Sequence, residues 1–318
     1  MKEPRAEDGE PRAASGVDMT IEVAGIRMQN PVLTASGTFG YAQEFEPHLD
    51  LNRLGGLVVK TITRLPRAGN PAPRITETPA GMLNAIGLQN VGVDVFIREK
   101  LPFLRTLAPP LIVNVAGESV EDFRELTKRI SDQEGVAGIE LNVSCPNVAG
   151  GLDFSTDPKL TYQVVKAARE ATRLPLIPKL SPNVTDIRVI ARAAEEAGAD
   201  GISLINTLVG MAIDVRTRRP KIANITGGLS GPAIRPVAVR MVWQVARAVK
   251  LPIIGMGGIF RGEDAAEFLI AGASAVAVGT ANFVDPTNVL KVLLELEQYC
   301  LTNGITAARH LIGSLQSP

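Results

Sequence analysis

The sequence predicts an α/β protein: a (β/α)8 TIM barrel with an N-terminal hairpin and insertions at the C-terminal face. Its 318 residues, 45% of them hydrophobic, are enough for one large core. Short apolar runs bounded by Gly and Pro alternate with longer helical patterns, which is the order of strands and helices in such a barrel. Polar residues or Gly directly follow these runs, as expected where strand ends surround a ligand site.

The first residues differ in character from the rest of the chain. Residues 1–17 alternate charge with Pro, Gly and Ala, which predicts a disordered tail, so one barrel domain is expected over residues 18–318. Apolar residues then alternate around Gly25 and predict a hairpin within residues 19–32. Such a hairpin is suited to closing the bottom of the barrel.

The strands and helices of the barrel follow in chain order. Apolar runs predict strands at residues 31–35, 57–60, 111–114, 136–143, 176–180, 201–205, 253–258 and 275–280. Helices are expected near residues 44–54, 93–104, 120–131, 158–172, 186–197 and 234–249, and after each of the last two strands. A Pro-rich insertion at 65–79 and an irregular segment at 208–229 interrupt this alternation.

Composition excludes several classes of function. Lys+Arg and Asp+Glu both number 33, so no net charge draws the chain to nucleic acid or to an anionic membrane. No apolar run approaches the ~20 residues of a membrane span, and the two cysteines suggest a reducing compartment, so we expect a cytoplasmic protein. The two histidines, His48 and His310, are not placed for a metal site or a Ser-His-Asp triad.

The central strand leads into the stretch with the most reactive side chain. Asn142 stands at the end of this strand and Cys145 follows in a loop. A free cysteine is more often a small buried hydrophobe than a catalyst. Here Pro146 and the Gly150-Gly151 pair favour an open loop, in which a partly exposed thiol is more probable. The loop from 144 to 157 is a candidate lid with Gly150-Gly151 as its hinge.

The other strand ends indicate a ligand that is anionic. Two lysines and several amides end strands, and three Gly-rich turns precede helices, where backbone N–H groups bind phosphate. A flavin has a phosphate for such turns and a ring that becomes anionic on reduction. The chain has neither a GxGxxG nor a GxxxxGK[ST] motif, so we expect no dinucleotide or nucleoside triphosphate. These turns include residues 227–231, 255–258 and 279–280.

The motifs at the strand ends resemble those of the class 1 dihydroorotate dehydrogenases. They are NVSCPN at 142–147, NAIGLQN at 84–90, KLSPNVTD at 179–186, Asn206-Thr207 and Gly257-Gly258. The match runs from about Met19 to the C-terminal helix and looks most like the B type, the catalytic subunit of an NAD-linked enzyme. The resemblance implies a TIM barrel that holds FMN and oxidises (S)-dihydroorotate to orotate in pyrimidine biosynthesis.

The resemblance also assigns roles to residues. Cys145 is implied as the base that removes the C5 proton while hydride leaves C6 for the flavin. The implied FMN contacts are Ser36, Lys60, Thr61, Asn114, Asn142, Lys179, Ile205, Gly231, Gly257, Gly258, Gly279 and Thr280. The implied pyrimidine contacts are Lys60, Asn84, Ala85, Ile86, Gly87, Leu88, Asn142, Asn206 and Thr207. No metal ligand is implied.

The B-type resemblance further implies a homodimer that binds an electron-transfer subunit carrying FAD and a 2Fe–2S cluster. Two cysteines are too few to ligate such a cluster in this chain. One alternative is the A type, a lone homodimer that uses fumarate. Another is a phosphate-binding barrel lyase or isomerase without flavin, which would need a Schiff-base lysine or a carboxylate pair. A non-catalytic scaffold would leave the polar strand ends without purpose.

Overall fold

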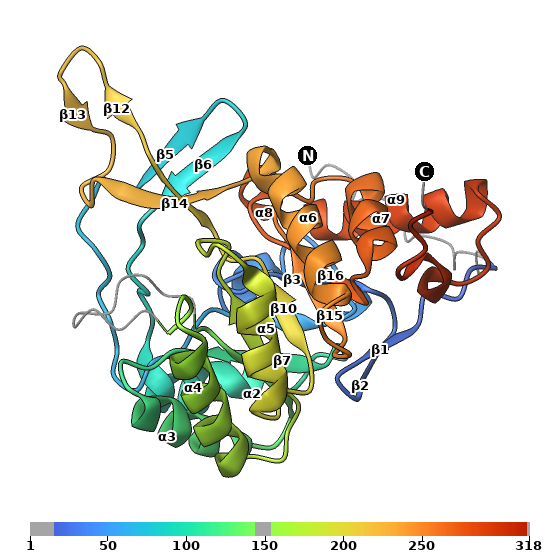
Figure 1. Cartoon of the computed structure of the whole chain (residues 1–318), viewed down its shortest axis with the longest axis horizontal. Helices are drawn as coiled ribbons and strands as arrows, with labels where there is room; N and C mark the ends of the chain where they lie inside the picture. The colour runs from blue at the N-terminus through green and yellow to red at the C-terminus, as the bar shows by residue number, and fades with distance from the viewer. Residues whose placement is uncertain (1–15, 144–153, 317–318) are drawn as a thin grey trace, which may run out of the picture.

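A parallel sheet of eight strands forms the centre of the molecule (Figure 1). The computed structural model describes residues 16–143 and 154–316. Around the sheet the strand order is β3-β16-β15-β10-β9-β8-β7-β4. The strands are β3 (Val32–Thr34), β4 (Leu57–Val58), β7 (Leu111–Val115), β8 (Val136–Leu141), β9 (Leu176–Leu180), β10 (Ile202–Leu204), β15 (Ile253–Met256) and β16 (Ala275–Val278). These strands confirm the expected runs.

The first and last strands of this order meet, so the sheet closes into a barrel. Leu33 forms a parallel bridge with Gly56, directly before β4. The hydroxyl of Thr34 continues the seam: it accepts from Val58 N at 3.0 Å and donates to Val58 O at 3.2 Å. A side chain thereby replaces backbone hydrogen bonds where the two short strands separate. The (β/α)8 barrel expected from the sequence is confirmed.

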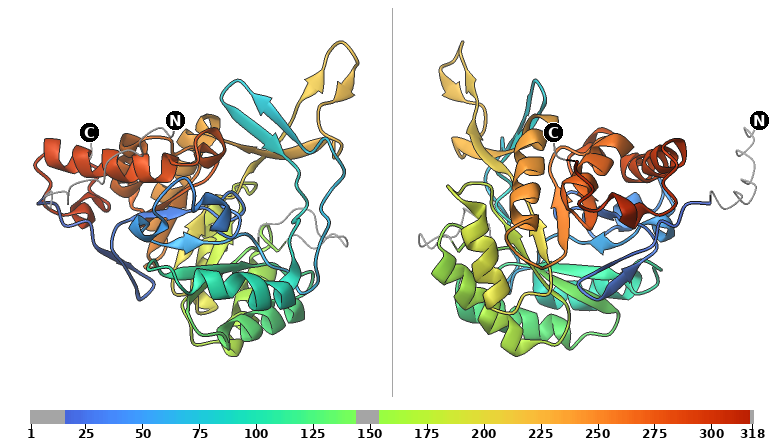
Figure 2. Two further views of the ribbon diagram at one scale, coloured as in Figure 1. Left: turned by 180° about the vertical axis from the view of Figure 1, so that it is seen from behind. Right: turned by 45° about the vertical axis from the view of Figure 1, so that its right-hand side comes forward.

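Helices follow the strands and cover the outside of the barrel (Figure 2). The longer ones are α3 (Val120–Ser131), α4 (Pro158–Ala171), α5 (Ile187–Glu196), α6 (Arg235–Ala246), α7 (Gly262–Ala271) and α9 (Asn288–Thr302), with the short α8 (Ala281–Val284) before α9. Ser119, Asp157 and Asp186 each accept a backbone N–H at the start of α3, α4 and α5. Such caps define where these helices begin.

Two of the expected helices differ in form. The segment near 44–54 contains two short 3-10 helices, η1 (Gln43–Phe45) and η2 (Leu51–Arg53), and no α-helix. Pro47 lies between them and has no N–H to continue a helix. The segment near 93–104 is helical but includes a π turn, η3 (Phe96–Lys100), between α1 (Gly92–Val95) and α2 (Leu101–Leu104). Pro102 stands in the first turn of α2, where its missing N–H is tolerated.

The N-terminal hairpin closes one end of the barrel. It consists of β1 (Ile21–Val23) and β2 (Ile26–Met28), paired antiparallel. Its buried residues form one hydrophobic cluster with inward-facing strand residues such as Ile112 and Ile177. Ile26 approaches the barrel so closely that a Cβ on Gly138 would lie 2.8 Å from its Cδ1. The expected tail falls mainly on residues 1–15, which lie outside the described residues.

The two insertions form a second sheet at the opposite end of the barrel. It has the order β11-β14-β6-β5 and contains β5 (Ile75–Thr78), β6 (Gly81–Asn84), β11 (Leu208–Met211) and β14 (Thr226–Ser230). The expectation that 208–229 is irregular was therefore wrong. A further hairpin, β12 (Ile213–Asp214) with β13 (Arg219–Pro220), protrudes beside β5 and β6 (Figure 1). The 3-10 helices η4 (Pro232–Ile234) and η5 (Ala308–Leu311) complete the described elements.

Truncating the hairpin's apolar contact should destabilise the barrel. For Ile26→Ala we expect a loss of about 2–5 kcal/mol in the free energy of unfolding, because a buried side chain leaves a cavity. Arg27→Ala is the matched control: it is exposed in the same strand and should change stability by less than about 0.5 kcal/mol. Urea unfolding measures both values. Equal, small losses would show that the hairpin does not support the barrel.

Candidate active site

A cavity of about 1000 Å³ lies at the carboxyl ends of the barrel strands, under the second sheet. Its lining brings together residues from segments far apart in the sequence. Among them are the expected positions Ser36, Lys60, Thr61, Asn84, Ala85, Ile86, Gly87, Leu88, Asn142, Lys179, Ile205, Asn206, Thr207, Gly231, Gly257, Gly258, Gly279 and Thr280. The structure thus gathers these residues at one site, and their contacts with a ligand stay a prediction.

Of the expected site residues that the structure describes, one is not in this lining. Asn114 is fully buried and does not line the cavity, so in this structure it is not placed to contact a ligand directly. It is the fourth residue of β7, and it lies beneath Ser36 in contact with the barrel interior. Cys145 lies outside the described residues, as do 144–153 of the candidate lid with the Gly150-Gly151 pair.

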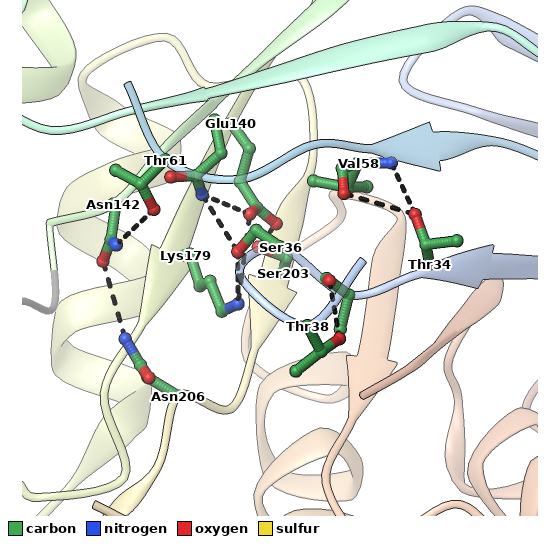
Figure 3. A network of polar contacts seen from close by, with 12 residues as sticks. Thr34, Ser36, Thr38, Val58, Thr61, Glu140, Asn142, Lys179, Ser203 and Asn206 are labelled. Carbon is green, nitrogen blue, oxygen red and sulfur yellow. Dashed lines mark hydrogen bonds and ion pairs between the residues drawn. The ribbon is translucent and has the colours of Figure 1, made fainter. Parts of the chain in front are cut away.

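Buried polar groups form the floor beneath the cavity (Figure 3). Ser36 Oγ accepts from Lys179 Nζ at 3.0 Å and from Asn114 Nδ2 at 3.3 Å. Glu140 accepts from Asn114 Nδ2 at 2.5 Å and from Ser203 Oγ at 2.7 Å. These side chains come from five strands or strand ends of the barrel. Their mutual hydrogen bonds satisfy groups whose burial without partners would cost a few kcal/mol each.

A chain of amides continues from this floor along the cavity wall (Figure 3). Asn142 Nδ2 donates to Thr61 Oγ1 at 3.4 Å, and Asn206 Nδ2 donates to Asn142 Oδ1 at 3.5 Å. Asn206 Oδ1 in turn accepts from the backbone N–H of Thr207 at 2.7 Å. These contacts orient two amides at the ends of β8 and β10, which are separated by β9 in the barrel. Amides present both a donor and an acceptor, which suits a ligand with alternating N–H and C=O groups.

The segment 84–88 also lines the cavity, and its backbone is held by Asn70. Asn70 donates through Nδ2 to Ala85 O at 2.9 Å and through its backbone N–H to Ile86 O at 3.0 Å. Gly87 has φ 75° and Leu88 has φ 54°, so the chain turns through the left-handed region here. A β-carbon on Gly87 would lie 2.7 Å from Asn70 N. The tight turn therefore requires glycine at this position.

The Gly-rich segments meet at a third part of the cavity. A β-carbon on Gly258 would lie 2.8 Å from Gly231 O, and one on Gly231 would lie 2.6 Å from Gly81 Cα. Thr280 Oγ1 donates to Ser230 Oγ at 2.8 Å, joining the end of β14 to the end of β16. Residues 227–230 were expected in a turn, but they are part of strand β14. Close packing alone accounts for glycine at 231 and 258.

The surroundings of Lys60 lower the pKa of its side chain. Its side chain follows β4 and lines the cavity. Burial, and secondarily the nearby charge of Arg74, lower the pKa of the Lys60 ammonium from its usual value. Both effects disfavour the charged form. An anionic group bound beside Lys60 would oppose them, so this position favours an anionic ligand.

Sequence reasoning missed some of the residues around the cavity. Ser203 is fully buried within β10, and a hydroxyl inside an otherwise apolar strand was the signal available for it. The rim also carries Ile75, Phe283 and Val284, which line the cavity and are exposed. No motif marks such apolar residues. Among the residues that the structure describes, no helix has the length and apolarity needed to cross a bilayer.

Comparison with known proteins gives a consistent result. The family model for dihydroorotate dehydrogenase matches residues 18–300. Catalytic subunits named dihydroorotate dehydrogenase B (NAD+) are similar in sequence. The protein from Geobacter metallireducens is 59% identical over 94% of this chain and 98% of its own. The protein from Desulforudis audaxviator is 58% identical over 94% and 97%.

A solved structure supports the same relationship. The crystal structure of DHODH from Eimeria tenella in complex with ferulenol aligns with a TM-score of 0.79 and 26% identity. The alignment covers 93% of this chain and 88% of that protein. Fold and sequence agree with the resemblance noted from the motifs. The chain belongs to the dihydroorotate dehydrogenase family.

Proposed function

We propose that this chain is the FMN-binding catalytic subunit of an NAD-linked, B-type dihydroorotate dehydrogenase that oxidises (S)-dihydroorotate to orotate in the cytoplasm. The observation that supports this most directly is the convergence of the expected FMN and pyrimidine residues on one cavity at the strand ends. Residues 18–318 would act as one domain around it. Similarity to relatives named as B-type subunits favours this reading over the fumarate-dependent type and over a flavin-free lyase.

The cavity fits FMN in its size and in its polar groups. Its volume of about 1000 Å³ leaves room for the cofactor and a pyrimidine together. Gly231 and Gly258 let the backbone come close to a phosphate there, and Ser230, whose Oγ accepts from Thr280, keeps its own O–H to donate. On the floor, Lys179 and Ser36 would hold the ring. Asn114 Oδ1 is buried without a hydrogen-bond partner, but Asn114 does not line the cavity, so its part would be to hold Ser36 in place from below.

Substrate would be held by the amides and by Lys60. Asn142 and Asn206 are already oriented by their contacts with Thr61 and with each other. The carboxylate of dihydroorotate would be attracted by Lys60, and the segment 84–88 would help to position the ring. FMN, when bound, supplies the acceptor for the hydride from C6. The protein's part is to orient the pyrimidine and to remove the C5 proton.

Cys145 is the proposed base for that proton. It lies two residues after Val143, the last described residue before the gap, and the assignment rests on the family resemblance. Only the thiolate can accept a proton, and a free thiol with a pKa of ~8.5 is mostly protonated at neutral pH. The rate of proton removal should therefore rise toward alkaline pH. A general base typically contributes a factor of about 10²–10⁴ to the rate.

We further propose that the chain forms a homodimer and binds an electron-transfer subunit with FAD and a 2Fe–2S cluster. The names of similar proteins as catalytic subunits of NAD+ enzymes support a partner. The chain itself carries only two cysteines, too few for the cluster. NAD+ would then be reduced on the partner.

Removing the thiol should slow flavin reduction. For Cys145→Ala we expect the rate of reduction by dihydroorotate in anaerobic stopped flow to fall by about 10²–10⁴, with loss of its rise toward alkaline pH. Cys300→Ala is the matched control, because Cys300 is fully buried in α9 and burial raises the pKa of its thiol. It should leave the rate and its pH dependence unchanged. An unaltered rate in Cys145→Ala would exclude this base.

Replacing Lys60 should weaken binding of orotate. For Lys60→Met we expect orotate to bind about ten- to a hundredfold more weakly, since a hydrogen bond to a charged group contributes about 1.5–3 kcal/mol. Because the pKa of Lys60 is lowered, wild-type affinity should decline with rising pH below the usual range of a lysine. Titration calorimetry measures both effects. Lys166→Met, on the exposed face of α4, is the control, and identical affinities would contradict the assignment.

Electron transfer to NAD+ should depend on another protein. We expect the purified chain to be reduced by dihydroorotate but not to reduce NAD+, and we expect a reconstituted iron–sulfur flavoprotein subunit to restore NADH formation. Absorbance at the NADH band follows this reaction. A single chain that reduces NAD+ unaided would refute the proposed partner while leaving the oxidation of dihydroorotate intact.

A further inference from the structure

Glu140 is a buried acid that the reaction above does not use. It lies on β8, and its side chain is 1% exposed. One carboxylate oxygen, Oε1, accepts from Asn114 Nδ2 at 2.5 Å and lies 4.0 Å from Lys179 Nζ. The other, Oε2, accepts from Ser203 Oγ at 2.7 Å. Both oxygens are engaged below the cavity, which Glu140 itself does not line.

The contact with Lys179 links this acid to the cavity. The Lys179 side chain is 7% exposed, and it is one of the lining residues. A buried charge without a counterion costs several kcal/mol, so removing either member of this pair would leave the other without its partner in the protein. Of the acids in the described ranges 16–143 and 154–316, Glu140 is the one found within ion-pair distance of Lys179. The charge of the floor therefore depends on Glu140.

The contact with Asn114 determines how an amide is oriented. An ionised carboxylate only accepts hydrogen bonds, so Asn114 must direct its NH₂ group toward Glu140. The same NH₂ group donates to Ser36, and Oδ1 is left as the side of the amide that can accept. Ser36 Oγ already accepts from both Asn114 and Lys179, which leaves its own O–H to donate. Glu140 thus fixes the orientation of the Asn114 amide and, through it, the hydrogen bonds that Ser36 can make.

We propose that Glu140 is a positioning residue for the flavin: as counterion of Lys179 and acceptor for Asn114, it sets the charge and the hydrogen-bonding groups that the floor presents to the ring. This inference rests on FMN occupying the cavity, as proposed above. A flavin ring becomes more negative when it is reduced. A carboxylate beneath it disfavours reduction and an ammonium favours it, so the two residues should have opposite effects on the flavin potential.

Potentiometric titration of the FMN-loaded chain tests this directly. We expect Glu140→Gln, which is nearly isosteric, to favour the reduced over the oxidised flavin by about tenfold, a rise of about 30 mV for a two-electron couple. Lys179→Met should shift the potential downward. Glu121→Gln, at an acid that is 73% exposed on α3, is the control and should leave the potential unchanged. A lower melting temperature for Glu140→Gln at an unchanged potential would mean a purely structural role and overturn the proposal.

A second comparison applies if Glu140→Gln does not fold or does not retain FMN. The double variant Glu140→Gln/Lys179→Met leaves neither charge without its partner. Because it lacks the carboxylate, its flavin potential should be higher than that of Lys179→Met. Equal potentials in these two variants would contradict the proposal.

Urea unfolding of the flavin-free chain tests the ion pair by itself. The double variant should lose less stability than the sum of the two single variants, and additive losses would argue against the pair. A wild-type chain that binds no flavin would instead overturn the proposed function, which this unfolding experiment does not require.

Discussion

The parallel closure of the barrel is the constraint on which the site depends. Because the eight strands run in one direction, their carboxyl ends meet at one edge, and residues as distant in sequence as Ser36 and Thr280 line one cavity. The hairpin fills the other end, and Thr34 joins the two strands that complete the ring. The same geometry places polar side chains where water is largely excluded, so each needs a partner within the protein.

The hydrogen-bonded side chains beneath the cavity form its floor, and they determine which groups face a ligand. Glu140, Ser203 and Asn114 lie too deep for the cavity, yet they hold Lys179 and Ser36 in place. Their burial makes charge effects strong, because the effective dielectric constant is low there. Lys60 on the wall is less deeply buried than these residues, but its burial still lowers its pKa. The cavity is therefore prepared for a ligand that supplies negative charge.

The sequence was most informative about the barrel and its strand ends. Apolar runs bounded by polar residues located the strands, and longer helical patterns located most of the helices, including α3. The second sheet was not predictable, because Gly227 and Gly228 weaken strand propensity and Gly228 pairs with the distant Asn84. Local sequence also did not separate Asn114, which is buried, from the cavity-lining Asn142. Only three-dimensional packing decides that difference.

The visible spectrum of the purified chain, recorded before and after anaerobic addition of dihydroorotate, tests the central claim most directly. A flavin site formed by these strand ends predicts a yellow protein that is bleached by dihydroorotate. A colourless chain that takes up no added FMN, or a yellow one that dihydroorotate leaves unchanged, would contradict the account.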